Sequence, residues 1–166
     1  MTPEQAKTIL DFLMPTLHSE VKTTAKVIAA APADQEGYKP SERCMSALSL
    51  AWHIASADVW FLNSMIDGKF ESPGGGMPET IKTTADVSAW YDANMPPAMA
   101  RLAGASLESL AAPVSFFGMF EWPALTYLNF SMLHTSHHRG QLSSYLRPMG
   151  GKVPSIYGGS ADEPMK

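Results

Sequence analysis

Four long stretches of the chain carry apolar residues at helical spacing, and no stretch shows the strict alternation of a β-strand. The first begins at Thr2-Pro3, an N-cap residue followed by proline at the first helical position, and stops in the turn-rich segment AAAPADQEGYKPSE. The second covers about residues 46–66, and Asp67-Gly68 follows as a C-cap pattern. Four helices of this length predict an all-α protein folded as a four-helix bundle.

Prolines mark the limits of the other two helices. The third is expected to start near Thr84, and Pro96-Pro97 inside it is expected to kink or break it. The fourth is expected to start around Trp122, with a proline in its first turn, and to end before Pro148.

Two connecting segments bear on the topology. ESPGGGMPETIKT, between the second and third helices, is long enough for a crossover in place of simple up-down order. No strand precedes its glycines and no Lys-Ser/Thr follows them, which favours a flexible connection over a phosphate-binding loop. The C-terminal KVPSIYGGSADEPMK has too many turn residues for a regular element and is expected to pack over one end of the bundle.

Length and charge narrow the class of protein. A chain of 166 residues is long enough for one domain, spanning 1–166, with a real apolar core. The net charge of −4 argues against phosphate-rich partners, so we expect neither nucleic acid nor a membrane as a partner. No secretory leader or membrane-spanning run is visible, and a single cysteine, Cys44, fits a reducing compartment. These features predict a cytoplasmic protein in which Cys44 is a bystander and not a nucleophile.

Three of the five histidines fall within HTSHHRGQL, residues 134–142. His134 and His138 are four residues apart and share one helical face, where polar groups inside a bundle need partners. A metal ion suits two neutral imidazoles one turn apart, but such a site needs a third ligand. His53, on a stripe with small residues, is the other histidine in the middle of a helix and is the candidate.

Several alternatives and neighbouring residues also enter this interpretation. A buried histidine is more often a hydrogen-bonded core residue than a ligand, and Thr135 replaces the glutamate of an HExxH peptidase. Asp58 is expected to point away from the site, so only Glu20 would allow a site of two histidines and a carboxylate. We expect Arg139 in a surface ion pair or dimer contact. We expect three polar residues to lie beside the histidine ligands and orient bound molecules: Tyr127, Ser131 and Gln141. His137 is expected to lie next to the ligands or at the surface, and His18 is expected to be structural or exposed.

LAWHIASADVWFL, followed much later by HTSHHRGQLSSYLRPMGGKVPSIYGGSADE, resembles the DinB/YfiT-like family of small metal-binding four-helix bundles. The resemblance covers nearly the whole chain. It implies one divalent metal, zinc or nickel, held by His53, His134 and His138 in a cytoplasmic protein that often forms homodimers. It further implies, for some members, a similarity to thiol S-transferases that use a low-molecular-weight thiol, or to a thiol-dependent isomerase.

Three imidazoles on a divalent ion leave at least one position open, as catalytic sites require. The sequence therefore favours a metal-dependent enzyme that activates a thiol or water for attack on a small electrophile. The alternative is a non-catalytic, metal-stabilised, stress-related binding module. Apolar residues near the start of the last helix are expected to form either a hydrophobic entrance or a core or dimer surface (Phe116, Phe117, Met119, Phe120).

Overall fold

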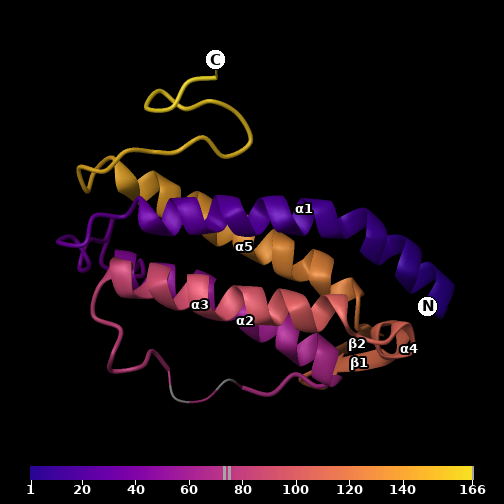
Figure 1. Ribbon diagram of the computed structural model, residues 1–166. Helices are drawn as coiled ribbons and strands as arrows, with labels where there is room; N and C mark the ends of the chain where they lie inside the picture. Colours follow the sequence, from indigo (N-terminus) through magenta and orange to yellow (C-terminus); the bar gives the residue numbers. More distant parts are fainter. Residues whose placement is uncertain (73, 75, 166) are drawn as a thin grey trace.

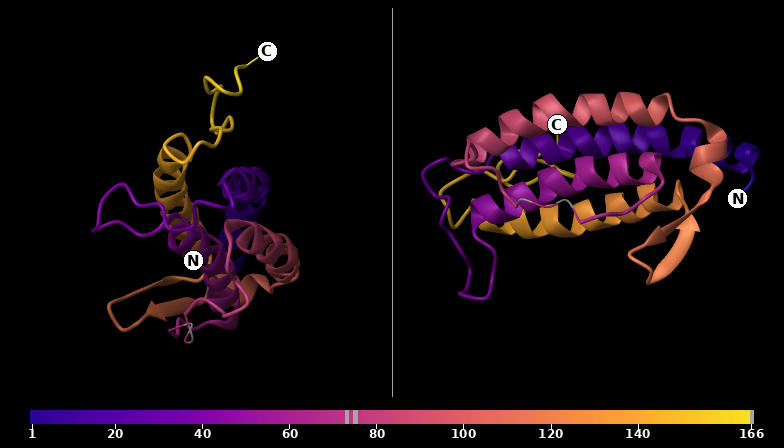
Figure 2. Two further views of the ribbon diagram at one scale, coloured as in Figure 1. Left: turned by 90° about the vertical axis from the view of Figure 1, so that its left-hand side faces the viewer. Right: turned by 90° about the horizontal axis from the view of Figure 1, so that it is seen from below.

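The computed structural model describes residues 1–72, 74 and 76–165. Its four long helices are α1 (Pro3–Ala29), α2 (Ala47–Asp67), α3 (Thr84–Ala103) and α5 (Thr126–Leu146). α1 and α2 each pack against α3 and α5, so α1 and α2 lie at opposite corners of the bundle (Figures 1 and 2). The predicted all-α four-helix bundle is confirmed.

The long connection between α2 and α3, residues 68–83, returns along the length of the bundle before α3 begins (Figure 1). As a result α2 and α3 run in the same direction, and α1 and α5 run in the opposite one. The crossover expected between the second and third helices is therefore present. Its consequence for the site is that α2 and α5 become antiparallel neighbours.

Side-chain caps define the helix ends that the sequence predicts. Thr2 and Gln5 form a reciprocal capping box at the start of α1, with Gln5 N donating to Thr2 Oγ1 at 3.2 Å and Thr2 N donating to Gln5 Oε1 at 2.8 Å. Thr83 and Asp86 form the same motif at α3. Gly68 ends α2 in the left-handed region, with φ of 70°, where glycine has no Cβ to clash.

The last helix begins later than the sequence suggested, at Thr126 and not at Trp122. Residues 113–123 form a β-hairpin instead, in which β1 (Pro113–Phe116) pairs antiparallel with β2 (Phe120–Pro123). The expectation of no strands was therefore wrong. Positive φ values of 52° at Phe117 and 74° at Gly118 form the turn. The hairpin follows the short helix α4 (Leu107–Ala111) and projects at the end of the bundle where α2 ends (Figure 2).

The third helix is continuous through Pro96-Pro97, so the expected break does not occur. Residues around the prolines are buried in the bundle, among them Met95, Ala98 and Leu102, each no more than 2% exposed. This apolar burial stabilises the helix by several kcal/mol, which opposes the cost of roughly 3 kcal/mol for each of the two prolines in the helix interior.

The C-terminal segment lies against the ends of α1 and α5, as expected from its position. Glu163 accepts a hydrogen bond from Lys26 near the end of α1 at 2.8 Å, and Asp162 pairs with Arg147 just after α5 at 3.0 Å. Within the described residues, none of the helices combines the length and the apolarity that a bilayer crossing requires.

Candidate metal centre

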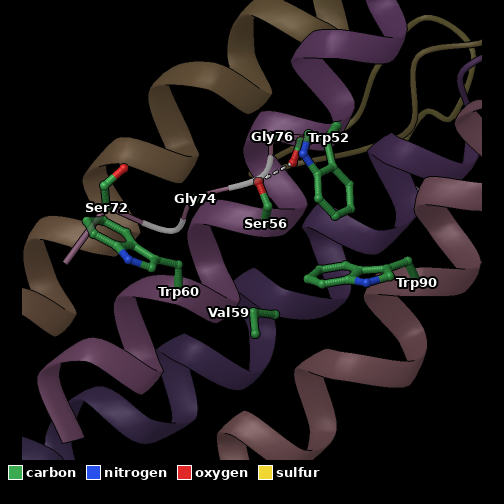
Figure 3. Close-up of a pocket in the computed structure, with 8 residues that line it drawn as sticks. All are labelled: Trp52, Ser56, Val59, Trp60, Ser72, Gly74, Gly76 and Trp90. Atoms are coloured by element: carbon green, nitrogen blue, oxygen red, sulfur yellow. Dashed lines mark hydrogen bonds between the residues drawn. The ribbon is translucent and has the colours of Figure 1, made fainter. Parts of the chain in front are cut away.

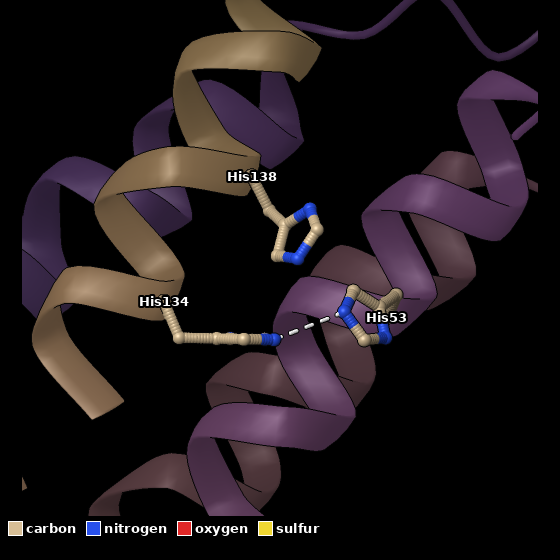
Figure 4. A group of neighbouring side chains, drawn as sticks. All are labelled: His53, His134 and His138. Carbon is tan, nitrogen blue, oxygen red and sulfur yellow. Dashed lines mark hydrogen bonds between the residues drawn. The ribbon is translucent and has the colours of Figure 1, made fainter. Parts of the chain in front are cut away.

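His53 lies in the second turn of α2, and His134 and His138 lie one turn apart in the middle of α5. The three rings converge between the two helices (Figure 4), with ring centroids separated by 4.5 Å, 4.5 Å and 4.9 Å. One nitrogen from each ring lies within 4.8 Å of the others. The structure therefore brings together the three histidines that the sequence singled out, and this group could hold a metal ion.

The closest approach in the group is between Nε2 of His53 and Nε2 of His134, at 3.1 Å. Two nitrogens bound at about 2.05 Å to one tetrahedral ion stand about 3.3 Å apart, so the observed spacing is close to that of shared ligands. The same spacing also suits a hydrogen bond in which one ring carries the proton. In either case the two nitrogens face each other closely enough to share one ion or one proton.

The surroundings keep two of the rings neutral. Burial, reinforced by the neighbouring histidines, lowers the pKa of His134 from 6.5 to about 4, and burial together with His138 lowers the pKa of His53. A neutral imidazole has a free lone pair, which is the form that binds a metal. At neutral pH these two side chains are therefore ready to act as ligands without losing a proton.

Gln141 fixes the orientation of His138. The amide oxygen of Gln141 can only accept, so Nδ1 of His138, 2.8 Å away, donates to it, and this contact selects the neutral tautomer in which Nε2 carries the lone pair. The amide nitrogen of Gln141 contacts Nε2 of the exposed His137 at 3.2 Å. His134 has no such support, because its buried Nδ1 has no hydrogen-bond partner among the described residues.

The other two residues expected beside the ligands serve elsewhere. The Tyr127 hydroxyl donates to the carbonyl of Val114 at 2.7 Å and thereby ties α5 to the hairpin. Ser131 is buried and lines a small internal cavity that also touches Asp58. Of the three expected residues, only Gln141 makes a hydrogen bond to one of the histidines.

No carboxylate joins the histidine group among the residues that the structure describes. Asp58 points away from the histidine group, as predicted, and into the bundle, where it accepts hydrogen bonds from Thr135 and, at 2.8 Å, from Tyr91. Glu20 is paired with Arg139 at 2.6 Å. A site of two histidines and one carboxylate therefore has no support.

Arg139 is not the surface residue that the sequence suggested, since its side chain is only 1% exposed. Its guanidinium donates to the Glu20 carboxylate at 2.6 Å, to Thr24 at 3.1 Å and to the Tyr157 hydroxyl at 2.6 Å. The inward face of α5 is offset by one residue from the histidines, which places Arg139 in the interior. A complementary acidic residue on α1 was the signal that could have indicated this burial.

A cavity of about 330 Å³ opens beside the histidines. Phe116 of β1 lines it, which agrees with the expectation of a hydrophobic entrance, whereas Met119 is exposed at the hairpin turn. Ala57 and Trp60 of α2 lie on the same helical stripe as His53, whose small residues indicated a pocket. The sequence did not indicate the wall from α5, because that depends on which helices are neighbours. The described residues that line the cavity are His53, Ser56, Ala57, Trp60, Phe61, Phe116, Phe130 and His134.

A second cavity, of about 570 Å³, adjoins the first under the crossover segment (Figure 3). Trp60 and Ser56 line both cavities, and the Trp60 indole is held by a hydrogen bond from Nε1 to the carbonyl of Glu71 at 2.9 Å. Trp52 and Trp90 pack edge to face on its other side, with centroids 4.8 Å apart. None of the three histidines is among the described residues that line this cavity.

Fold and site together define a helical bundle with a crossover and a three-histidine group between α2 and α5. The chain belongs to the DinB family, whose model matches residues 10–165. The uncharacterized protein YrdA of Bacillus subtilis is 23% identical over 154 residues, covering 93% of this chain and 91% of YrdA. YjoA of the same organism is 31% identical over 118 residues, covering 70% of this chain and 75% of YjoA.

Two solved structures share the fold. The crystal structure of the DinB-like protein YjoA from Bacillus subtilis superimposes with a TM-score of 0.69 and 24% identity, covering 90% of this chain and 97% of that one. A DinB-like protein from Bacillus cereus ATCC 10987 gives a TM-score of 0.76 and 21% identity, covering 89% and 97%. At these identities the structures establish the architecture of the bundle and nothing about its chemistry.

Proposed function

We propose that the protein is a metal-dependent enzyme in which His53, His134 and His138 hold a divalent ion, zinc or nickel, that activates a thiol or water. The observation that supports this proposal is the convergence of three ring nitrogens within 4.8 Å of one another at the edge of an open, apolar cavity. A closed structural site would use four protein ligands, whereas three leave a position for a small molecule.

When bound, such an ion lowers the pKa of a coordinated thiol or water towards 7 and so supplies a nucleophile without a carboxylate base. The residues of the chain provide the rest. His53 and His134 stay neutral because their pKa values are lowered, and Gln141 favours the tautomer of His138 in which Nε2 is the free nitrogen. The phenylalanines of the cavity exclude water from one side of the reacting centre.

The reaction that suits this arrangement is transfer of a low-molecular-weight thiol to an electrophilic carbon. The sulfur forms a bond to that carbon, the leaving group departs with its electron pair, and the thiol proton passes to solvent. Nothing is oxidised or reduced. Water in place of the thiol would make the same step a hydrolysis.

Elemental analysis of protein purified without added metal, followed by zinc and nickel titration, tests the first half of the proposal. We expect one ion per chain, and binding weakened by roughly 100-fold or more in His53→Ala. His18→Ala, which changes an exposed histidine on α1, is the matched control. Consumption of free thiol with a set of small electrophiles tests the second half, and wild-type protein with a bound ion but no thiol consumption or hydrolysis contradicts it.

A second candidate function is a metal-stabilised binding module, because an ion held by His53 on α2 and two histidines on α5 would cross-link the two helices. His53→Ala separates the two functions when melting temperature and turnover are both measured. Lost turnover with near-normal melting favours the enzyme. A large fall in melting temperature, in a protein whose wild type never turns over, favours the module.

A further inference from the structure

We infer that the cavity next to the three histidines binds an uncharged aromatic group of the substrate, with the reacting atom facing the histidine nitrogens. This inference rests on the proposed function for the direction of the reacting atom. The binding of the aromatic group itself depends only on the walls of the cavity, which come from α2, α5 and the hairpin.

The chemistry of the walls selects against charge. Most of the lining is formed by Ala57 and four aromatic side chains, those of Trp60, Phe61, Phe116 and Phe130. No described lining residue has an acidic, lysine or arginine side chain. A charged group buried there would lose its hydration without meeting an opposite charge on a described lining side chain, because His53 and His134 have lowered pKa values and are neutral; the cost is several kcal/mol. An apolar guest meets no such cost.

The rings of the walls are arranged to present both edges and faces. Phe61 meets Phe130 edge-on with centroids 5.6 Å apart, meets the ring of His134 edge-on at 5.5 Å, and lies parallel to Phe116 within 7°. Aromatic pairs prefer these edge-to-face and offset parallel arrangements, which contribute about 0.5–1.5 kcal/mol beyond area burial. A flat guest can therefore continue the cluster where an alkyl chain gains only its area.

The cavity is held open by contacts outside it. Phe116 stacks on Phe120 with centroids 5.1 Å apart, and Phe61 is buried in the core at 3% exposure. Trp60 is fixed by its hydrogen bond to Glu71. A preformed pocket spends little binding energy on ordering its own side chains.

Size sets the class of guest. An apolar cavity of about 150 Å³ holds one benzene, and the cavity here is about 330 Å³. The space suits one substituted ring or two fused rings. Because His53 and His134 form one side of the cavity, the reacting atom is expected on the ring or on the carbon attached to it.

Calorimetric titration with 2-naphthol and 2-naphthoate tests the inference on protein stripped of metal by a chelator. The two ligands share one ring system and differ in charge. We expect 2-naphthol to bind and 2-naphthoate to bind at least about tenfold more weakly. Equal affinity for both, tighter binding of 1-octanol than of 2-naphthol, or no binding of 2-naphthol at its solubility limit overturns the inference.

Variants place the guest in this cavity. Phe130→Ala removes a wall, and Ala57→Leu fills the space; each is expected to weaken 2-naphthol binding about tenfold while zinc binding stays within about twofold. Phe12→Ala, on a side chain 78% exposed on α1, is the control and should bind as wild type does. Wild-type affinity for 2-naphthol in both cavity variants overturns the inference.

The metal-stripped titration also separates this inference from the proposed function. If the protein binds 2-naphthol but takes up no metal ion, the aromatic pocket is supported and the proposed metal-dependent enzyme is contradicted. If the protein binds a metal ion but not 2-naphthol, the aromatic pocket is contradicted and the metal site is supported.

Discussion

Thr135, the residue after His134 on α5, donates a hydrogen bond to the buried carboxylate of Asp58 on α2. Asp58 also accepts from Tyr91 on α3 at 2.8 Å, so three helices meet at one side chain. Consecutive residues of a helix point about 100° apart. A contact that holds Thr135 in the interior therefore also sets the direction in which His134 leaves the helix.

Thr135→Val keeps the shape of the side chain and removes its donor. The substitution leaves one oxygen of buried Asp58 without that partner, so we expect a loss of about 1–3 kcal/mol in the free energy of unfolding. We also expect zinc affinity to fall about tenfold, because the rotation of α5 is less fixed. Urea unfolding and zinc titration measure the two effects, with Ser144→Ala on the exposed side of α5 as control.

Acidification of the metal-free protein is expected to act through His134. Its pKa is about 4 in the folded protein against 6.5 ordinarily, so between these values the unfolded chain takes up a proton that the folded protein does not. Stability therefore falls as the pH falls from about 6.5 to 4, by on the order of 2 kcal/mol for this partly buried group. Urea unfolding at a series of pH values with a chelator present measures the loss.

Asp58 opposes this trend, and the Asp58→Asn variant isolates its effect. Burial raises the pKa of Asp58 to about 6, above its ordinary 3.8, so the folded protein takes up a proton first as the pH falls through this window. That uptake favours folding at acid pH and offsets part of the cost at His134. Asp58→Asn should consequently show a steeper loss of stability between pH 6 and 4 than the wild type. An equal or shallower loss would contradict a raised pKa of Asp58 in the folded protein.

Gln141→Leu is expected to lower zinc affinity about 10- to 100-fold without unfolding the protein. The amide oxygen that holds Nδ1 of His138 is lost, and a ligand whose other nitrogen is unsupported is both less oriented and less basic. His137→Ala, which removes only the outer contact of the same glutamine, should change affinity by less than about threefold. Equal effects of the two variants would contradict a positioning role for Gln141.

Arg139→Met tests the buried ion pair. Removing the guanidinium leaves Glu20, whose side chain is only 15% exposed, without its charged partner, and a loss of about 3–5 kcal/mol in unfolding free energy is expected. Lys7→Met is the comparison, since Lys7 pairs with Asp11 at 2.7 Å on the surface, and it should cost less than about 1 kcal/mol. Chemical denaturation of both variants gives the contrast.

The positions of the histidines could be predicted because helical spacing is regular. His134 and His138, four residues apart, share a face whatever packs against them. Their proximity to His53 depends on which helices are neighbours, and spacing alone does not contain that information. Elimination among five histidines and the family resemblance supplied it.

Arg139 and the hairpin show where such reasoning ends. His138 and Arg139 are consecutive residues of α5, yet His138 lies at the side of the bundle and Arg139 in its interior. The apolar pattern of this helix is too weak to predict which of the two faces inward. Trp122 and Pro123 look like a helix start, yet they pair across from Val114 and Pro113. The missing N–H of proline is tolerated at the end of a strand as well as at the start of a helix.

The hairpin supplies a wall of the cavity through Phe116 but none of the three imidazoles. The hairpin can therefore change in length and in its side chains during evolution while the histidine nitrogens on α2 and α5 keep their positions. Within such a lineage, inheritance of the same histidines does not entail inheritance of the same substrate. Two related proteins with the same three histidines and different hairpins are therefore expected to differ in substrate specificity.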